Sequence, residues 1–144
     1  MNMIYTHLTN QALKVAYTAH HGQVDKGGIP YVFHPYQVAQ AMTDEYSTCV
    51  ALLHDVVEDT NVTLQDLQKI FPDQITEAIA ALTHTKGEDY MVYLARVKAN
   101  PIAKAVKLAD IEHNANATRM PDAKLETKAY FQKKYADALA FLNA

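Results

Sequence analysis

Apolar residues recur at intervals of three and four along most of the chain, which is the spacing of helices with one buried face. The first such stretch contains Leu8, Ala12, Val15, Ala16 and Ala19. No segment shows the alternation of apolar and polar residues that is typical of a half-buried strand. The pattern predicts helices over residues 8–19, 35–42, 47–57, 64–71, 75–82, 90–99 and 102–117, and a last helix that begins at 121–122. We therefore expect an all-α fold, a compact bundle of about eight helices, with residues 1–144 as a single domain.

Polar residues and glycines mark the expected ends of these helices. Ser47 or Thr48 can cap the third helix, because a side-chain oxygen can accept from the unpaired N–H groups of a first turn. Thr63 followed by Asp66 resembles a capping box at the start of the fourth helix. Residues 22–35 contain three of the four glycines and are predicted to form a loop.

The composition excludes several classes of protein. The chain has 144 residues, of which 49% are hydrophobic and 20% charged, the balance of a soluble globular protein. A net charge of −3 argues against a nucleic-acid partner, which would need a basic surface. One cysteine, Cys49, excludes an internal disulfide and a cysteine-rich zinc site. No signal sequence or membrane span is evident, so we expect a cytoplasmic protein without a membrane partner.

The segment over residues 51–60 is the richest in chemistry. It contains His54, Asp55, Glu58 and Asp59 within six residues. On a helix, His54 and Glu58 lie one turn apart, as do Asp55 and Asp59, so these side chains would be close neighbours. A solvated acidic helix end is one interpretation, but the flanking valines and leucines favour burial. Buried carboxylates repel one another unless a cation compensates them, so the segment favours a bound cation.

Two further residues lie in settings that suit metal ligands. His34 stands where a loop meets a helix, and Asp110 interrupts an aliphatic helical stretch, with Asn114 one turn further along. Each alone can be explained as a helix cap or as a core polar group with a hydrogen-bond partner. Together with the pair formed by His54 and Asp55, they give the order histidine, histidine–aspartate, aspartate along the chain.

This order resembles that of the HD-domain metal phosphohydrolases. The detail resembles the hydrolase domain of RelA/SpoT-type alarmone enzymes, over about residues 12–119. The segments that carry the resemblance are HGQVDKGGIPYVFHP (21–35), ALLHDVVEDT (51–60) and VKLADIEHN (106–114). Because the chain leaves no room for a synthetase or regulatory domain, we expect a small, stand-alone alarmone hydrolase of the HD-domain fold.

The resemblance implies one divalent metal ion as cofactor, usually manganese, held by His34, His54, Asp55 and Asp110. Imidazole and carboxylate ligands without a thiolate also suit Fe²⁺, Co²⁺ or Zn²⁺. Four other histidines are expected to be helix-end groups or to support the ligands: His20, His21, His84 and His113.

Glu58 and Asp59 match the family's catalytic Glu–Asp pair, which orients or deprotonates the attacking water. Lys26 and Asn114 match family residues on the nucleotide side of the site. By position, Lys86 and Lys107 are candidates for phosphate contacts, with ordinary surface charge as the alternative. Tyr130 is a further candidate for the substrate pocket, with packing as its alternative.

Four positions depart from the family pattern. Asp25 replaces an arginine that lies against the guanine base in relatives, and an aspartate cannot copy that planar cation. The other three are Gly27 for serine, Ile111 for arginine and Ala117 for threonine. The resemblance thus implies a nucleotide pyrophosphohydrolase that acts on a 3′-pyrophosphate, as on guanosine-3′,5′-bis(diphosphate). Alternatives are an HD phosphohydrolase for an adenosine alarmone or a dinucleotide cofactor phosphate, and a nucleotide-sensing module without catalysis.

Overall fold

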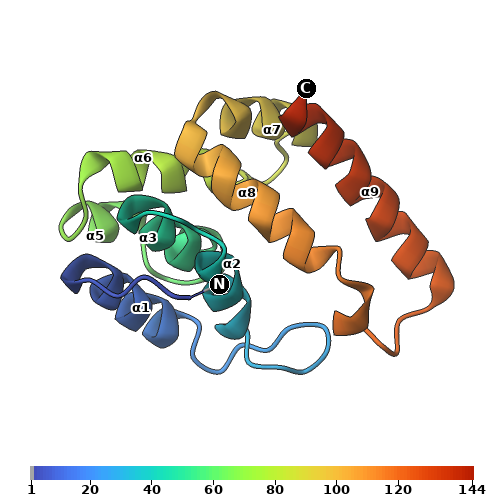
Figure 1. The fold of residues 1–144 in the computed structure, drawn as a ribbon, viewed down its shortest axis with the longest axis horizontal. Coiled ribbons are helices and arrows are strands. Elements are labelled where there is room, and N and C mark those ends of the chain that lie inside the picture. Colours follow the sequence, from blue (N-terminus) through green and yellow to red (C-terminus); the bar gives the residue numbers. More distant parts are fainter. Residues whose placement is uncertain (1) are drawn as a thin grey trace.

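The computed structural model describes residues 2–144, and helices account for most of them (Figure 1). The order along the chain is α1 (His7–Ala19), α2 (Phe33–Gln40), α3 (Glu45–Leu53), α4 (Val56–Asp59), α5 (Leu64–Gln68), α6 (Asp73–Leu82), α7 (Tyr90–Ala99), α8 (Pro101–Asn114), the 3₁₀ turn η1 (Ala117–Arg119) and α9 (Leu125–Asn143). Among residues 2–144, β pairing is limited to an isolated bridge between Val24 and Pro30. The expected all-α fold is confirmed.

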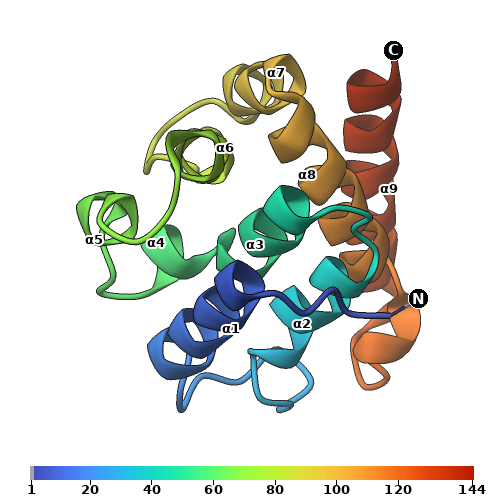
Figure 2. The ribbon, with the colours of Figure 1, turned by 60° about the vertical axis from the view of Figure 1, so that its left-hand side comes forward.

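Helix α3 is the centre of the fold. Every residue over 47–53 is buried. The apolar run over 49–53 accounts for most of this stretch, and α3 packs against α1, α2, α6 and α8 (Figures 1 and 2). A helix that is apolar on all sides is stable only when other helices surround it. The central position of α3 brings the turn at its C-terminal end, over residues 54–55, close to α2 and α8.

Two predicted boundaries of the central segment are wrong. The third helix begins at Glu45, and its cap is Asp44, whose side chain accepts a hydrogen bond from the backbone N–H of Ser47 at 2.8 Å. Ser47 and Thr48, the predicted caps, lie inside the helix and are buried. The same segment is not one helix to residue 57, because a turn over residues 54–55 separates α3 from α4.

Other helix ends follow their local sequence signals. The capping box is present, since Thr63 accepts from the backbone of Asp66 while Asp66 accepts from the backbone of Thr63. Helix α8 begins at Pro101, a residue type suited to the first turn of a helix, and Asn100 is its cap. It ends at Asn114 rather than at the predicted residue 117.

The C-terminal helix covers one side of the bundle. Helix α9 packs against α7 and α8, with Ala138 and Leu142 as its buried residues (Figures 1 and 2). It is the longest helix in residues 2–144, yet most of its surface is exposed. None of the helices in that part of the chain combines the length and apolar character that crossing a bilayer requires.

Candidate metal centre and adjoining cavity

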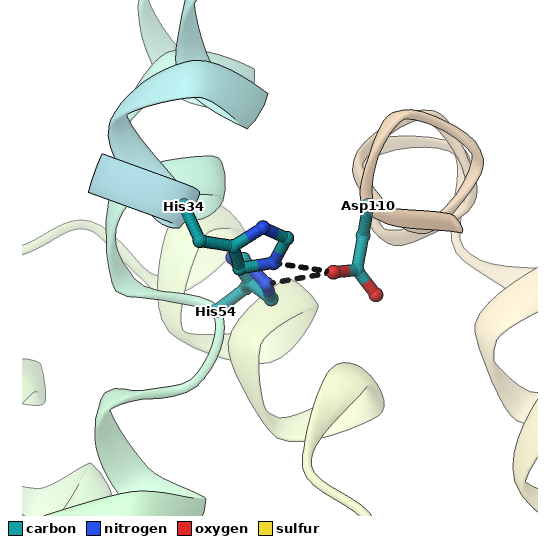
Figure 3. A group of neighbouring side chains, drawn as sticks. All are labelled: His34, His54 and Asp110. Carbon is teal, nitrogen blue, oxygen red and sulfur yellow. Dashed lines mark hydrogen bonds and ion pairs between the residues drawn. The ribbon is translucent and has the colours of Figure 1, made fainter. Parts of the chain in front are cut away.

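Three side chains from distant parts of the sequence converge at one point. His34 lies in the first turn of α2, His54 in the turn after α3, and Asp110 on α8. All three are buried, and each offers a ligand atom within 4.8 Å of the other two (Figure 3). The Asp110 Oδ1 atom lies 2.7 Å from His34 Nε2 and 3.4 Å from His54 Nε2. Two imidazoles and a carboxylate in this arrangement could hold a divalent metal ion.

The protonation of His54 supports a cation at this point. Its Nδ1 lies 2.6 Å from the carbonyl oxygen of Ala51, which can only accept, so Nδ1 carries a proton. Its Nε2 is buried and makes no hydrogen bond within residues 2–144, although the carboxylates of Asp55 and Asp110 are 3.1 and 3.4 Å away. A lone pair that faces carboxylate oxygens at these distances is repelled unless a positive charge lies between them. The donor set therefore fits a metal ion.

The pKa shifts of His54 and Asp110 both favour their charged forms. Burial disfavours the charged ring, but the carboxylates of Asp55 and Asp110 outweigh it and hold the pKa of His54 well above its usual value. Burial also disfavours ionised Asp110, but the ammonium of Lys107 and the two histidines hold the pKa of Asp110 well below its usual value. The negative potential that favours a proton on His54 would equally favour a metal cation.

Two other residues of α8 hold the carboxylate of Asp110 in place. Lys107 donates to its Oδ2 at 3.0 Å, and the amide of Asn114 donates to its Oδ1 at 3.1 Å. The three residues stand at positions i, i+3 and i+7, so they share one face of the helix. Lys107, a candidate for phosphate contacts by sequence, is thus already bonded to a carboxylate.

Asp55 stands beside this group of three. Its Oδ2 is 3.1 Å from His54 Nε2, and it accepts a hydrogen bond from the hydroxyl of Tyr31. The interruption between α3 and α4 places both His54 and Asp55 in a turn, so they need not diverge as neighbours on a regular helix do. Sequence reasoning missed Tyr31, because its contact with Asp55 joins residues 24 positions apart.

Glu58 and Asp59 lie on the short helix α4, and both are exposed. Glu58 accepts a hydrogen bond from the backbone N–H of His84 at 2.7 Å, which ties α4 to the loop after α6. Partial removal of water, with the charges of Asp55 and Glu58, raises the pKa of Asp59 to about 6. A carboxylate with a pKa near neutrality is suited to accept a proton.

A cavity of about 350 Å³ adjoins Asn114, and the loop between α1 and α2 forms one of its walls. Its lining residues are Val24, Asp25, Lys26, Gly27, Tyr31, Asn114, Arg119, Met120 and Tyr135. Two of the four predicted substrate contacts, Lys26 and Asn114, are among them. Lys86 and Tyr130 are not, since Lys86 is exposed on the α6–α7 loop and the Tyr130 side chain is 64% exposed. Tyr135, more than one helical turn after Tyr130, lines the cavity instead.

The departures from the family pattern have specific places in this wall. The Asp25 carboxylate accepts from the backbone of Gly27 and Ile29 and lies 3.3 Å from the Arg119 guanidinium. Arg119 also donates to the side chain of Asn114 at 2.8 Å. A Cβ atom at Gly27 would lie 2.8 Å from the carbonyl oxygen of Arg119, so this close approach requires glycine.

Ile111 does not line this cavity. Ile111 is buried in the hydrophobic core, and the side chain of Ala117 lies outside the described part of the chain. Sequence reasoning missed Arg119, because its partners Asp25 and Asn114 meet it only in the folded chain. Its one signal was the scarcity of arginine, of which the chain has two.

Comparison with known proteins agrees with this architecture. The family model described as HD domain matches residues 12–107. The GTP pyrophosphokinase rsh of Brucella melitensis is 35% identical over 123 residues, covering 74% of this chain and 16% of its own. The guanosine-3′,5′-bis(diphosphate) 3′-pyrophosphohydrolase of Escherichia coli O157:H7 is 32% identical over 119 residues, with coverage of 72% and 17%.

A solved structure is similar over nearly the whole chain. It is that of a metazoan ortholog of SpoT that hydrolyses ppGpp and plays a role in starvation responses. The TM-score is 0.78 at 25% sequence identity, and the match covers 96% of this chain and 88% of the other. The family model covers well over half of the residues, and the helical fold and the paired His54–Asp55 agree with it, so the chain belongs to the HD domain family.

Proposed function

We propose that this protein is a metal-dependent phosphohydrolase that releases pyrophosphate from the 3′ position of guanosine-3′,5′-bis(diphosphate). The proposed metal ligands are His34, His54, Asp55 and Asp110, and manganese is the expected ion. Activity of this kind is named for the Escherichia coli and metazoan relatives. The observation that carries the proposal is the buried Nε2 of His54, which has no hydrogen-bond partner among residues 2–144 and faces two carboxylates.

The chain's own residues supply the remaining requirements of hydrolysis. When bound, a divalent cation supplies positive charge that stabilises the phosphoryl oxygens and makes a water more acidic. Asp59, with a pKa of about 6, accepts a proton from the attacking water at neutral pH. Glu58, held by the backbone N–H of His84, orients that water. The water oxygen bonds to the phosphorus next to the ribose 3′ oxygen, and the bond between that phosphorus and the 3′ oxygen breaks. The 3′ oxygen takes a proton from solvent as pyrophosphate leaves.

The cavity beside Asn114 is the proposed site for the nucleoside part of the substrate. It contains Lys26 and Arg119 as cations, and Tyr31 and Tyr135 as aromatic surfaces. The ammonium of Lys26 lies 4.1 Å from the centre of the Phe131 ring, which holds it near the cavity wall. Lys86 and Tyr130 lie outside this cavity, so their contact with the substrate stays a separate prediction.

Pyrophosphate release from the manganese-loaded protein tests the proposal. With guanosine-3′,5′-bis(diphosphate) as substrate, we expect turnover, and a loss of 10²- to 10⁴-fold in the Glu58→Gln and Asp59→Asn variants. The control is Glu77→Gln, which neutralises an exposed carboxylate on α6 and should leave the rate unchanged. No pyrophosphate from the wild-type protein, in the presence of bound manganese, would reject the proposed activity.

A second candidate keeps the chemistry and changes the nucleotide. It is favoured by Asp25, whose carboxylate is bonded to its own loop and to Arg119, so this position presents no cation to a base. The candidates are an adenosine alarmone and a phosphorylated dinucleotide cofactor. A parallel assay of these compounds for released phosphate or pyrophosphate separates them by relative kcat/KM. Tight binding of a nucleotide without turnover of any compound would instead indicate a sensing module.

A further inference from the structure

The ring of His113 lies against the ring of His34, one of the proposed metal ligands. The two rings are nearly parallel, with an interplanar angle of 12° and centroids 5.0 Å apart. Their Nδ1 atoms are 2.7 Å apart, which is the distance of a hydrogen bond. One proton must therefore lie between the two nitrogens, because two lone pairs or two N–H groups at this distance would repel each other.

The position of that proton follows from what the metal centre requires. His34 Nε2 donates a hydrogen bond to Asp110 Oδ1 at 2.7 Å, since a carboxylate can only accept, so Nε2 is the atom of His34 that faces the place of the proposed cation. A metal ion needs a lone pair on Nε2 and would take the place of this proton, and a neutral imidazole then carries its single proton on the other nitrogen. With a metal ion bound, His34 would therefore be protonated on Nδ1, and the Nδ1 atom of His113 would accept.

The other proposed histidine ligand has the same arrangement with a different acceptor. His54 donates its Nδ1 proton to the carbonyl oxygen of Ala51 at 2.6 Å. A second hydrogen bond of this kind fixes the tautomer and the ring orientation of a metal-binding histidine. His34 has no such carbonyl in its hydrogen bonds within residues 2–144, and the side chain at 2.7 Å is His113.

We propose that His113 is a positioning residue, whose Nδ1 accepts the proton of His34 Nδ1 and thereby presents His34 Nε2 to the metal ion. This inference rests on the proposed metal-dependent function. His113 is three residues after Asp110, and Asn114, the next residue, donates to Asp110. Consecutive residues at the end of α8 thus each hold one proposed ligand: His113 holds His34, and Asn114 holds Asp110.

Metal affinity of paired variants tests the proposal without reference to catalysis. Asparagine at position 113 keeps an acceptor oxygen near the place of the histidine Nδ1, whereas leucine has similar bulk and no acceptor. We expect His113→Leu to weaken Mn²⁺ and Zn²⁺ binding about 10- to 100-fold, as other losses of such partners do. His113→Asn should restore the affinity to within about threefold of wild type. The measurement is competition with a chelating dye on the full chain, with circular dichroism as the check on folding.

A direct readout on the wild-type protein covers the case in which a variant does not fold. In long-range ¹H–¹⁵N spectra of the Zn²⁺-loaded chain, we expect His34 to be protonated on Nδ1 and His113 to be protonated on Nε2. An unprotonated His34 Nδ1 would overturn the proposal, as would wild-type affinity in His113→Leu. Equal losses in both variants would indicate packing rather than hydrogen bonding. Wild-type protein that binds neither ion would reject the metal-dependent function itself, and this inference with it.

Discussion

The fold disfavours the ionised form of the Asp59 carboxylate. Its pKa of about 6, against 3.8 for an ordinary aspartate, means that the ionised form is less stable in the folded chain than in the unfolded one. The resulting penalty is absent below about pH 4 and fully present above pH 6. Such a penalty is typical of functional sites, where charges are placed for chemistry rather than for stability.

Asp59→Asn should therefore stabilise the metal-free protein at pH 7.5 while it removes activity. Because the side chain is exposed and screened by solvent, we expect a gain of about 1 kcal/mol or less in the free energy of unfolding. The measurement is urea denaturation at pH 7.5 and at pH 4.5, where the gain should shrink as the wild-type carboxylate becomes protonated. A loss of stability at pH 7.5 would contradict the electrostatic account.

The same pKa predicts the acid side of the pH profile. If Asp59 accepts the proton of the attacking water, kcat/KM should fall about tenfold per pH unit below the apparent pKa of Asp59, which is at most about 6. Protonated Asp59 cannot accept a proton from water, so activity is lost as the pH decreases. Rates should be measured at saturating metal, since the charge of a bound cation lowers the apparent pKa. A profile with no acid limb at any pH below 6 would exclude Asp59 as the base.

Gly27 must be glycine because of a contact with a residue that is distant in the sequence, Arg119. Its added Cβ atom would lie 2.8 Å from the carbonyl oxygen of Arg119, which belongs to the backbone of η1. Gly27→Ala should therefore cost about 1 to 3 kcal/mol of stability, as overpacking does, and should raise KM because the loop lines the cavity. Thermal unfolding and Michaelis kinetics measure the two effects. Unchanged values of both would show that the loop and η1 separate freely.

At the scale of elements, the central helix illustrates both the reach and the failure of local signals. The apolar run over residues 49–53 predicts a buried helix, and α3 is buried from Ser47 to Leu53. Its start was misplaced because Ser47, Thr48 and Asp44 are all good caps, and the choice among them depends on where the helix enters the core. Its end was misplaced because the helical spacing of His54 to Asp59 continues across the turn.

The observed cap can be tested by a matched pair of substitutions. Asp44→Ala removes the oxygen that accepts from the N–H of Ser47, and should cost about 1 kcal/mol in the free energy of unfolding. Ser47→Ala removes a hydroxyl from the predicted cap position and should cost less than about 0.5 kcal/mol. Denaturant midpoints at constant m-value give the comparison. A larger loss of stability in Ser47→Ala than in Asp44→Ala would contradict Asp44 as the cap and support Ser47, the cap predicted from the sequence.

At the scale of the molecule, the candidate metal centre joins α2, α8 and the turn that follows α3. A cation that binds only the folded chain stabilises it by mass action, by about 2.7 kcal/mol at a free concentration of 100 times Kd. For a chain of this size, we expect Mn²⁺ to raise Tm by about 5–10 °C and a chelator to reverse the shift. His54→Ala should abolish the shift, whereas His21→Ala, which changes an exposed histidine, should retain it. Equal shifts in both variants would place the cation elsewhere.

The sequence by itself determined the features that depend on neighbours along the chain. The helical spacing, the capping box of Thr63 and Asp66, and the proline at the start of α8 predict the all-α fold, because a turn of helix is stabilised within a few residues. The paired His54–Asp55 and the family resemblance also indicated which side chains to consider together.

Only the tertiary structure decided which of those side chains meet. It brought His34, His54 and Asp110 together, set Tyr31 against Asp55, and closed the cavity with Arg119 and Tyr135 in place of Tyr130. These contacts join residues that are tens of positions apart. They depend on how α2, α8 and α9 pack around α3, and helical periodicity contains no information about the distance between two helices.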